Sequence, residues 1–221
     1  MKKFLVLMLT ITGYLLAETP AIIVQAFENM AADSIYDYSY TKTENDGETT
    51  KLIKYDATLN GDDCWTLISV NGRKPTKDEL KDFYKSVSYQ GGNRRTMGVN
   101  SEKMYDITKI SEDDTYIEYK FKMYGDDDKD KKMQQKMDNH IVNNKADTNI
   151  AKITMTLTEP VSPMLSVKME KMNIDILFTK MNDTGAYRIK QTTMEIAGKF
   201  AVFKKIDRTN VTKYFDYELV D

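Results

Sequence analysis

Apolar and polar residues alternate along much of this chain, and this period of two constrains its fold more than any other feature. The segment 116–123 shows the alternation most clearly. Its odd positions are Ile117, Tyr119, Phe121 and Met123, and its even positions are Tyr116, Glu118, Lys120 and Lys122. Successive side chains of a strand point to opposite faces of the sheet. The pattern is therefore typical of an antiparallel strand with one face buried.

The same alternation, with turn residues between the segments, predicts further strands. Asn45-Asp46-Gly47 predicts the turn of a hairpin between strands at 36–41 and 48–57. The continuous apolar run 64–70 predicts a strand that is covered on both faces. The other expected strands are 104–110, 115–123, 140–143, 149–158, 164–180, 186–197, 199–206 and 210–220.

The apolar positions change parity inside the segment 164–180. Before the change they are Leu165, Val167 and Met169, and after it they are Met172, Ile174, Ile176 and Phe178. A strand keeps both sets on one face only if it contains an extra residue. We therefore expect a β-bulge or a sharp bend near Glu170-Lys171.

Three segments are predicted to be helical. The segment 20–32 has apolar residues at helical spacing, namely Ile22, Ile23, Ala26, Phe27 and Met30. The helix 76–88 begins with a capping box of Thr76 and Glu79, and its apolar stripe is Leu80, Phe83, Tyr84 and Val87. The segment 129–139 is expected to form a short helix with Met133 and Met137 on one side.

Together these elements predict a mainly β (α+β) fold. We expect a curved antiparallel sheet or half-barrel of about ten strands, with two or three helices packed on one face, because an open sheet of this size tends to curl or split. The chain contains no internal repeat and no Pro- or Ser-rich linker. Residues 18–221 are therefore expected to form a single β-rich domain.

Residues 1–17 have the pattern of a secretory signal peptide. Lys2 and Lys3 precede an uncharged apolar run from Phe4 to Leu16, and Ala17 ends it. The run is too short for a transmembrane helix, and no later stretch is long enough. We therefore expect a periplasmic protein that does not span the membrane after cleavage; the alternative is an extracellular location.

The composition excludes several classes of functional site. The single Cys excludes a disulfide scaffold, and the single His excludes a multi-histidine metal site within the chain. The net charge of −2 argues against nucleic-acid binding, which requires a basic excess. Cys64 is expected to be a buried, inert thiol and His140 a surface residue. We expect no cofactor and no catalytic residues.

Two further features of the sequence bear on metal binding. The acidic stretch Asp126–Asp130 lacks the Gly and Glu of a calcium-binding EF-hand loop, which favours a solvated cap on the following helix. Methionine occurs 14 times. The first interpretation is core filling, the second a plastic apolar cavity and the third a copper(I) site, and we predict no metal.

Two stretches resemble known bacterial proteins. Residues 64–83 (CWTLISVNGRKPTKDELKDF) and residues 149–178 resemble segments of uncharacterised secreted proteins of Gram-negative bacteria. The overall layout is similar to that of periplasmic lipoprotein carriers (the LolA-like fold). That resemblance implies a curved antiparallel sheet with helices in its concavity and binding of a lipid, and it assigns no residue.

The leading functional hypothesis is a non-enzymatic periplasmic protein that binds a hydrophobic ligand, such as a lipid or acyl chain, in the curved sheet. The candidate cavity residues are Met155, Met172, Ile174 and Phe178. The helix 76–88 is the expected lid. The alternative is a structural or interaction protein of the cell envelope that binds a protein partner through a sheet edge or an apolar patch, without a small ligand.

Overall fold

A single antiparallel sheet organises the chain. The computed structural model describes residues 19–34, 36–90, 101–164, 166–200 and 204–220, so the predicted signal peptide 1–17 lies outside the described residues. The described part contains eleven strands. They are β1 (Asp37–Asn45), β2 (Thr50–Tyr55), β3 (Trp65–Val70), β4 (Met104–Glu112), β5 (Tyr116–Met123), β6 (Met137–Asn144), β7 (Asn149–Leu157), β8 (Val161–Met164), β9 (Val167–Lys180), β10 (Tyr187–Phe200) and β11 (Lys204–Val220). The helices are α1 (Ala21–Asp33), α2 (Lys77–Gln90) and α3 (Asp128–Gln134), with single 3₁₀ turns η1 (Gly61–Cys64) and η2 (Ser101–Lys103).

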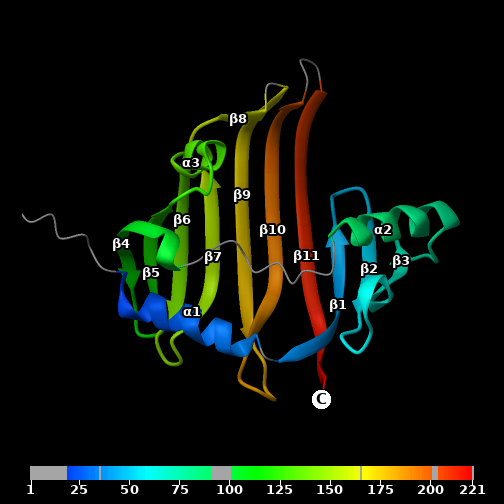
Figure 1. The fold of residues 1–221 in the computed structure, drawn as a ribbon, viewed down its shortest axis with the longest axis horizontal. Helices are drawn as coiled ribbons and strands as arrows, with labels where there is room; N and C mark the ends of the chain where they lie inside the picture. The colour runs from blue at the N-terminus through cyan, green and yellow to red at the C-terminus, as the bar shows by residue number, and fades with distance from the viewer. Residues whose placement is uncertain (1–18, 35, 91–100, 165, 201–203, 221) are drawn as a thin grey trace, which may run out of the picture.

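The strand order places the first and the last strand side by side. It runs β3-β2-β1-β11-β10-β9-β7-β6-β5-β4, and β8 pairs only with β9 outside this path. The amino-terminal hairpin therefore joins the sheet through β11, the last strand. Figure 1 shows an open, curved sheet whose edge strands are β3 and β4. This confirms the predicted fold class.

The register shows that α1 and α2 lie on the same face of the sheet. One row of directly paired residues crosses nine strands, from β5 to β3. Its members are Tyr119, Ile141, Ile153, Ile176, Thr192, Thr212, Glu44, Lys51 and Val70. The first three pack with α1 and Val70 packs with α2. We call this side the helix face.

Helix α1 closes the largest core cluster. Its Ile23 and Ala26 are fully buried, and they pack over Phe121 and Ile141, which are also fully buried. In Figure 1 the helix crosses in front of the strands at one end of the sheet. The predicted helix 20–32 is therefore confirmed. Its two buried residues, Ile23 and Ala26, are three positions apart, because only one side of the helix touches the sheet.

Helix α2 begins at the predicted capping box. The backbone N–H of Thr76 donates to the Glu79 carboxylate at 2.8 Å, and the N–H of Glu79 donates to the Thr76 hydroxyl at 3.3 Å. Arg73 adds two hydrogen bonds to the same carboxylate, at 2.7 and 2.9 Å. Phe83 then anchors the helix over Ile53 and Leu67 on β2 and β3.

The predicted β-bulge is confirmed in β9. Lys171 pairs with Ala197 on β10, and Met169 pairs with the next residue, Gly198. Glu170 is therefore the extra residue, as the parity change of the apolar positions indicated. Because of this bulge, Met169 and Met172 both join the cluster beside α3.

Four local predictions are wrong. The segment 164–180 is not one strand, because Met164 ends β8, Val167 begins β9 and these two strands pair antiparallel; Leu165 lies outside the described residues. The run 64–70 is not covered on both faces: β3 is an edge strand, and Ile68 is 43% exposed. Helix α3 ends at Gln134, and Met137 begins β6, where pairing with Leu157 supplies more buried contact than another helical turn. The segments 199–206 and 210–220 are not separate strands, because Lys204–Val220 is continuous.

Candidate functional site: the helix face of the sheet

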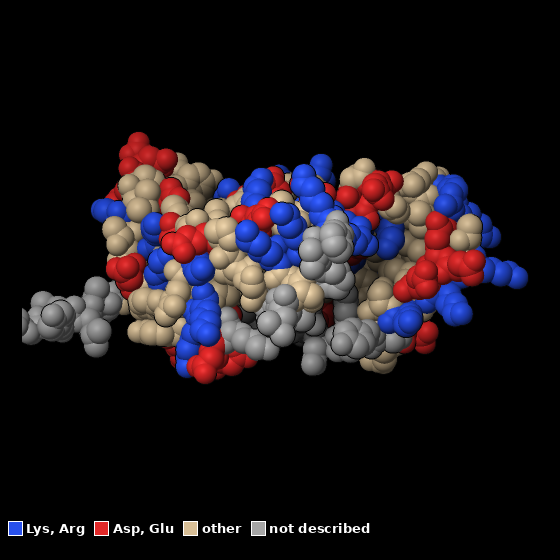
Figure 2. Space-filling view, turned by 90° about the horizontal axis from the view of Figure 1, so that it is seen from above, with Lys and Arg blue, Asp and Glu red and all other residues tan. Residues whose placement is uncertain are grey.

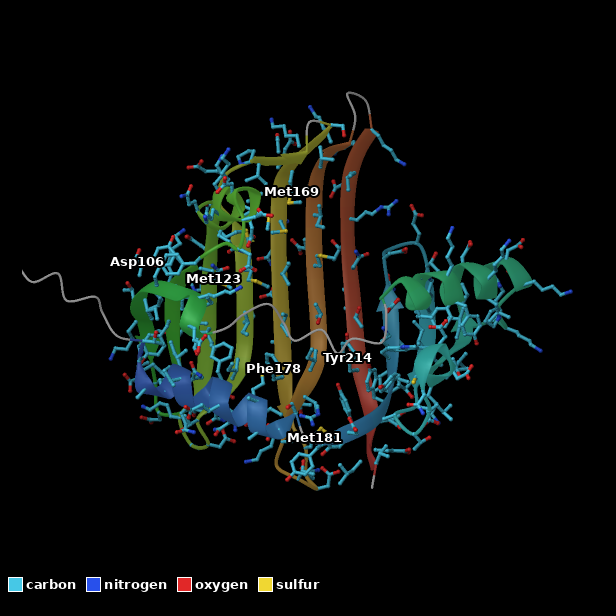
Figure 3. The ribbon with its side chains drawn as sticks, in the orientation of Figure 1. Asp106, Met123, Met169, Phe178, Met181 and Tyr214 are labelled. Carbon is cyan, nitrogen blue, oxygen red and sulfur yellow. The ribbon has the colours of Figure 1, made fainter. Side chains whose placement is uncertain are left out.

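The four residues predicted to line a cavity share one face of two neighbouring strands. Met155 lies on β7 and is directly paired with Ile174 on β9. Met172 and Phe178 lie at even spacing from Ile174 along β9, so all four point to the helix face. Figure 3 shows Phe178 on the side of β9 that faces α1.

These four residues form a strip that joins two core clusters. Phe178 packs against the α1 cluster, whereas Met172 is buried in the cluster beside α3. Met155 contacts both clusters, and Ile174 packs against the second. All except Met172 remain partly exposed. The strip therefore combines packing inside the sheet with accessible apolar surface.

The strip continues onto β10 and becomes polar on β11. Met194 is directly paired with Ile174, and Ile196 with Met172; both β10 residues are partly buried. On β11 the corresponding positions are polar, with Asn210 opposite Met194. We call Met155, Met172, Ile174, Phe178, Met194 and Ile196 the apolar strip.

Beyond β11, an aromatic cluster covers the helix face. Tyr40 on β1 is at its centre, with its ring centroid 5.1 Å from Tyr55, 5.6 Å from Tyr214, 5.5 Å from Tyr217 and 6.2 Å from Trp65. Tyr55 and Trp65 are 4.7 Å apart. All five side chains are partly buried. We call these five residues the aromatic patch.

Burial suppresses ionisation of the phenols in the aromatic patch. Desolvation raises the pKa values of Tyr40, Tyr214 and Tyr217 above the ordinary value of tyrosine. The negative charge of Glu44 raises the pKa of Tyr40 and Tyr214 further. The patch is therefore neutral at physiological pH, and its surroundings oppose added negative charge.

A lysine side chain lies on this patch. The Nζ atom of Lys42 is 4.8 Å from the centroid of the Trp65 ring and 2.6 Å from a carboxylate oxygen of Glu44. The Lys42 side chain is only 15% exposed, whereas that of Glu44 is 39% exposed. The ammonium is thus held by a ring face and a carboxylate at once.

No local sequence pattern indicates the aromatic patch. Tyr36, Tyr38 and Tyr40 alternate with polar residues, and this alternation predicts a strand only. The other rings come from β2, β3 and β11, which the sequence separates by up to 162 residues from Tyr55 to Tyr217. Pairing between β1 and β11 brings them together, and no local pattern encodes that pairing.

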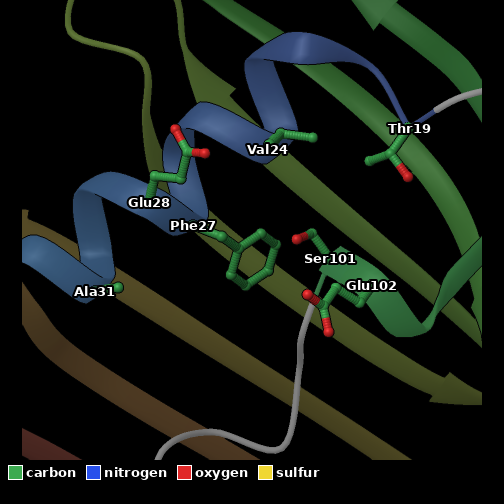
Figure 4. Close-up of a pocket in the computed structure, with 7 residues that line it drawn as sticks. All are labelled: Thr19, Val24, Phe27, Glu28, Ala31, Ser101 and Glu102. Atoms are coloured by element: carbon green, nitrogen blue, oxygen red, sulfur yellow. The ribbon is translucent and has the colours of Figure 1, made fainter.

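A shallow hollow of about 450 Å³ lies beside α1. Figure 4 shows Phe27 of α1 pointing toward Ser101 and Glu102 of η2. The lining residues are Thr19, Val24, Phe27, Glu28, Ala31, Ser101 and Glu102, so none of the four predicted cavity residues is among them. The predicted lid, α2, also lies away from those four, because it packs on β2 and β3.

His140 lies on the opposite face from the helices. Its Nδ1 atom is 2.8 Å from a carboxylate oxygen of Glu118, and the side chain is 30% exposed. The nearby carboxylate of Asp138 is occupied by Lys120 and Lys122, at 2.6 and 2.7 Å. This arrangement is a ladder of ion pairs across β5 and β6, in keeping with the predicted surface position of His140.

The acidic stretch before α3 serves as a cap. The carboxylate of Asp127 accepts a hydrogen bond from the N–H of Asp130, and that of Asp126 contacts Lys103 at 2.6 Å. In the part of the chain that the structure describes, no three potential metal-binding side chains of His, Cys, Asp or Glu come together. Figure 2 shows acidic and basic side chains interspersed on the upper side of the molecule, without a surface of one sign.

Comparison of the chain with protein-family models, with curated proteins and with solved structures found no match. Among the described helices, none combines the length and the hydrophobicity that crossing a bilayer requires.

Proposed function

We propose that this protein is an exported, non-enzymatic carrier or binding protein for a hydrophobic ligand, such as a lipid or acyl chain. The ligand lies along the apolar strip, between α1 and α2. The supporting observation is that Met155, Ile174 and Met194 line up across three neighbouring strands and stay partly exposed on the helix face. A contiguous apolar surface on a soluble sheet is typical of a binding site.

The chemistry of such binding is the removal of apolar surface from water. Each methylene of a chain that is buried against the strip contributes about 0.8 kcal/mol. Methionine suits this role because its unbranched thioether adapts to ligands of different shape. The pattern of residues 1–17 supports export to the periplasm, where such a carrier would operate.

The first experiment is native mass spectrometry of the protein purified from periplasm without detergent, followed by solvent extraction and lipid analysis. We expect a reproducible excess mass that is extracted as lipid. A bare polypeptide mass, together with failure to bind an added fatty acid, would contradict the proposal. Recovery from the cytoplasm only would contradict the proposed export.

A pair of matched variants locates the site. Met194→Gln places a polar group on the apolar strip, whereas Val211→Gln makes the same kind of change on the opposite face of the neighbouring strand. Both residues are partly buried. We expect Met194→Gln to weaken fatty-acid binding about tenfold and Val211→Gln to leave it unchanged, because burying an unpaired amide is costly. Equal effects would place the ligand elsewhere.

The edges of the sheet support a second candidate function, binding of an envelope protein without a small ligand. Each edge strand carries an exposed isoleucine: Ile68 on β3 is 43% exposed, and Ile110 on β4 is 50% exposed. Edge strands offer unpaired backbone groups to a partner. The test is a pull-down from envelope extracts. Recovery of one stable partner, and loss of that recovery in Ile68→Lys or Ile110→Lys, would favour this function.

A further inference from the structure

The aromatic patch and the apolar strip lie next to each other on the helix face. Ile176 on β9 and Thr212 on β11 belong to the same row of paired residues, with Thr192 of β10 between them. Phe178 and Tyr214 each lie two residues further along strands that run in the same direction. A bulge in β10 lies between them, since Leu177 pairs with Gln191 and Phe178 with Ile189. They are therefore within about one residue of the same level, roughly 10 Å apart across two strand spacings. Figure 3 shows both side chains on the same side of the sheet.

The aromatic patch has the composition of a site for an organic cation. Electron-rich ring faces of Trp and Tyr attract an ammonium group, and clusters of such rings recognise quaternary ammonium ligands. Here Tyr40, Tyr55, Trp65, Tyr214 and Tyr217 form one continuous set of rings, and Glu44 supplies a carboxylate at its border. The negative charge of that carboxylate raises the pKa values of Tyr40 and Tyr214, and it also disfavours binding of an anionic ligand.

The chain itself shows that a cation binds there. The Lys42 ammonium lies 4.8 Å from the centroid of Trp65 and forms an ion pair with Glu44 at 2.6 Å. The Lys42 side chain is only 15% exposed, because its methylene stem packs on the patch while its ammonium lies between the Trp65 ring and the Glu44 carboxylate. Lys42 thus occupies the position that a ligand ammonium would take.

We propose that the aromatic patch binds the alkylammonium head group of an amphipathic ligand whose chain lies on the apolar strip, and that Lys42 fills this site when no ligand is bound. The inference rests on the proposed function, and it adds the chemistry of the head group. Binding displaces Lys42 into solvent, and the ligand ammonium then takes its contacts with Trp65 and Glu44. No covalent step is involved.

Trp65 provides a direct test because it is the single tryptophan of the chain. Its fluorescence is followed during titration with three probes: decyltrimethylammonium, decanoate and tetramethylammonium. We expect decyltrimethylammonium to change the Trp65 emission and to bind about tenfold more tightly than decanoate, since an ammonium on aromatic faces gains energy that a carboxylate does not. We expect tetramethylammonium to bind weakly, with the same spectral change.

Lys42 and Lys51 form a matched pair of variants. Lys51 is directly opposite Glu44 on β2 and faces the same side, but among the described residues it lies over no ring. We expect Lys42→Gln to tighten decyltrimethylammonium binding several-fold by removing the competing ammonium. We expect Lys51→Gln to change it less than twofold. An equal gain in both variants would reflect net charge alone and would overturn the proposal.

Two further variants remove the recognition elements. Trp65→Leu and Glu44→Gln are each expected to abolish the preference for decyltrimethylammonium over decanoate, measured by calorimetry. Glu44 is partly exposed, so Glu44→Gln tests the site even if Trp65→Leu does not fold. Equal binding of the two decyl probes to the unmodified protein, without a Trp65 response, would overturn the head-group site and leave the hydrophobic carrier intact. Absence of binding by both would overturn both proposals.

Discussion

Gly198 approaches Lys168 so closely that a β-carbon on Gly198 would overlap the carbonyl oxygen of Lys168. The contact lies at the bulge, where Met169 pairs with Gly198 and Glu170 is left over. The backbones of β10 and β9 therefore lie in direct contact at Gly198, with no room for a side chain between them. Only glycine permits this approach.

We expect Gly198→Ala to lower the free energy of unfolding by about 1–3 kcal/mol, because the backbone must move apart to admit the methyl group. Urea unfolding measures the change. Lys199→Ala, at the exposed neighbouring residue, is the control and should have little effect. Equal stability of Gly198→Ala and the unmodified protein would show that the bulge can relax without cost.

The capping box gives a pH-dependent contribution to stability. Hydrogen bonds from Arg73 and from the backbone of Thr76 lower the pKa of Glu79 to about 2. A carboxylate whose pKa is depressed in the folded state stabilises the fold above its unfolded pKa, about 4.3, and loses this effect as the pH falls toward 2.

We therefore expect Glu79→Gln to lower the melting temperature at neutral pH, with a difference that shrinks steadily below about pH 4. Thermal melts of both proteins between pH 2 and pH 7 test this. Asp82→Asn, at an exposed residue of the same helix, is the matched control and should show no comparable difference. A difference that persists unchanged at about pH 2 would refute the role of the ionised carboxylate.

Helix α1 should be an integral part of the core. Its residue Ile23 is fully buried against the sheet, so Ile23→Ala is expected to reduce the free energy of unfolding by about 2–5 kcal/mol. Val24→Ala, at a partly buried residue beside the hollow, is expected to cost about 1 kcal/mol or less. Denaturant titration compares the two variants. Similar losses of unfolding free energy in the two variants would mean that burial of Ile23 does not hold α1 against the sheet.

Cys64 should react slowly with thiol reagents in the folded protein. Its side chain is buried, and its Sγ atom donates to the Leu59 carbonyl at 2.9 Å. It is the single cysteine, so labelling reports on this residue alone. We expect the rate to rise at least about a hundredfold on unfolding, because reaction requires an accessible thiolate. A native rate close to that in denaturant would contradict the inert assignment.

Local patterns in the sequence predicted features that depend on neighbouring residues. The parity change around Glu170 indicated the bulge, and Thr76 with Glu79 indicated the start of α2. Each of these signals concerns residues within a few positions of one another, where steric and hydrogen-bond rules act directly. The same local reasoning failed for Met137, because pairing with Leu157 in the sheet outweighed the helical spacing to Met133.

The candidate site could be predicted only in part for the same reason. Strand periodicity places Met172, Ile174 and Phe178 on one face of β9, and the pairing of Met155 with Ile174 adds Met155 to that face. Their role in ligand binding stays a prediction. Two other contacts have no local signal in the sequence: that of Lys42 with Trp65 and that of Tyr40 with Tyr214. The first depends on β2 pairing with both β1 and β3, and the second on β1 pairing with β11.

The sequence by itself determined the mainly β class, the faces of most strands and the start of α2, because these follow from periodicity and from the capping box. The tertiary structure alone decided the strand order, the exposure of β3 at an edge and the aromatic patch. Pairing β1 with β11 joins residues more than 150 positions apart, as Asp37 and Val220 show. Such pairing is set by the total burial and hydrogen bonding of the whole sheet, which no short segment encodes.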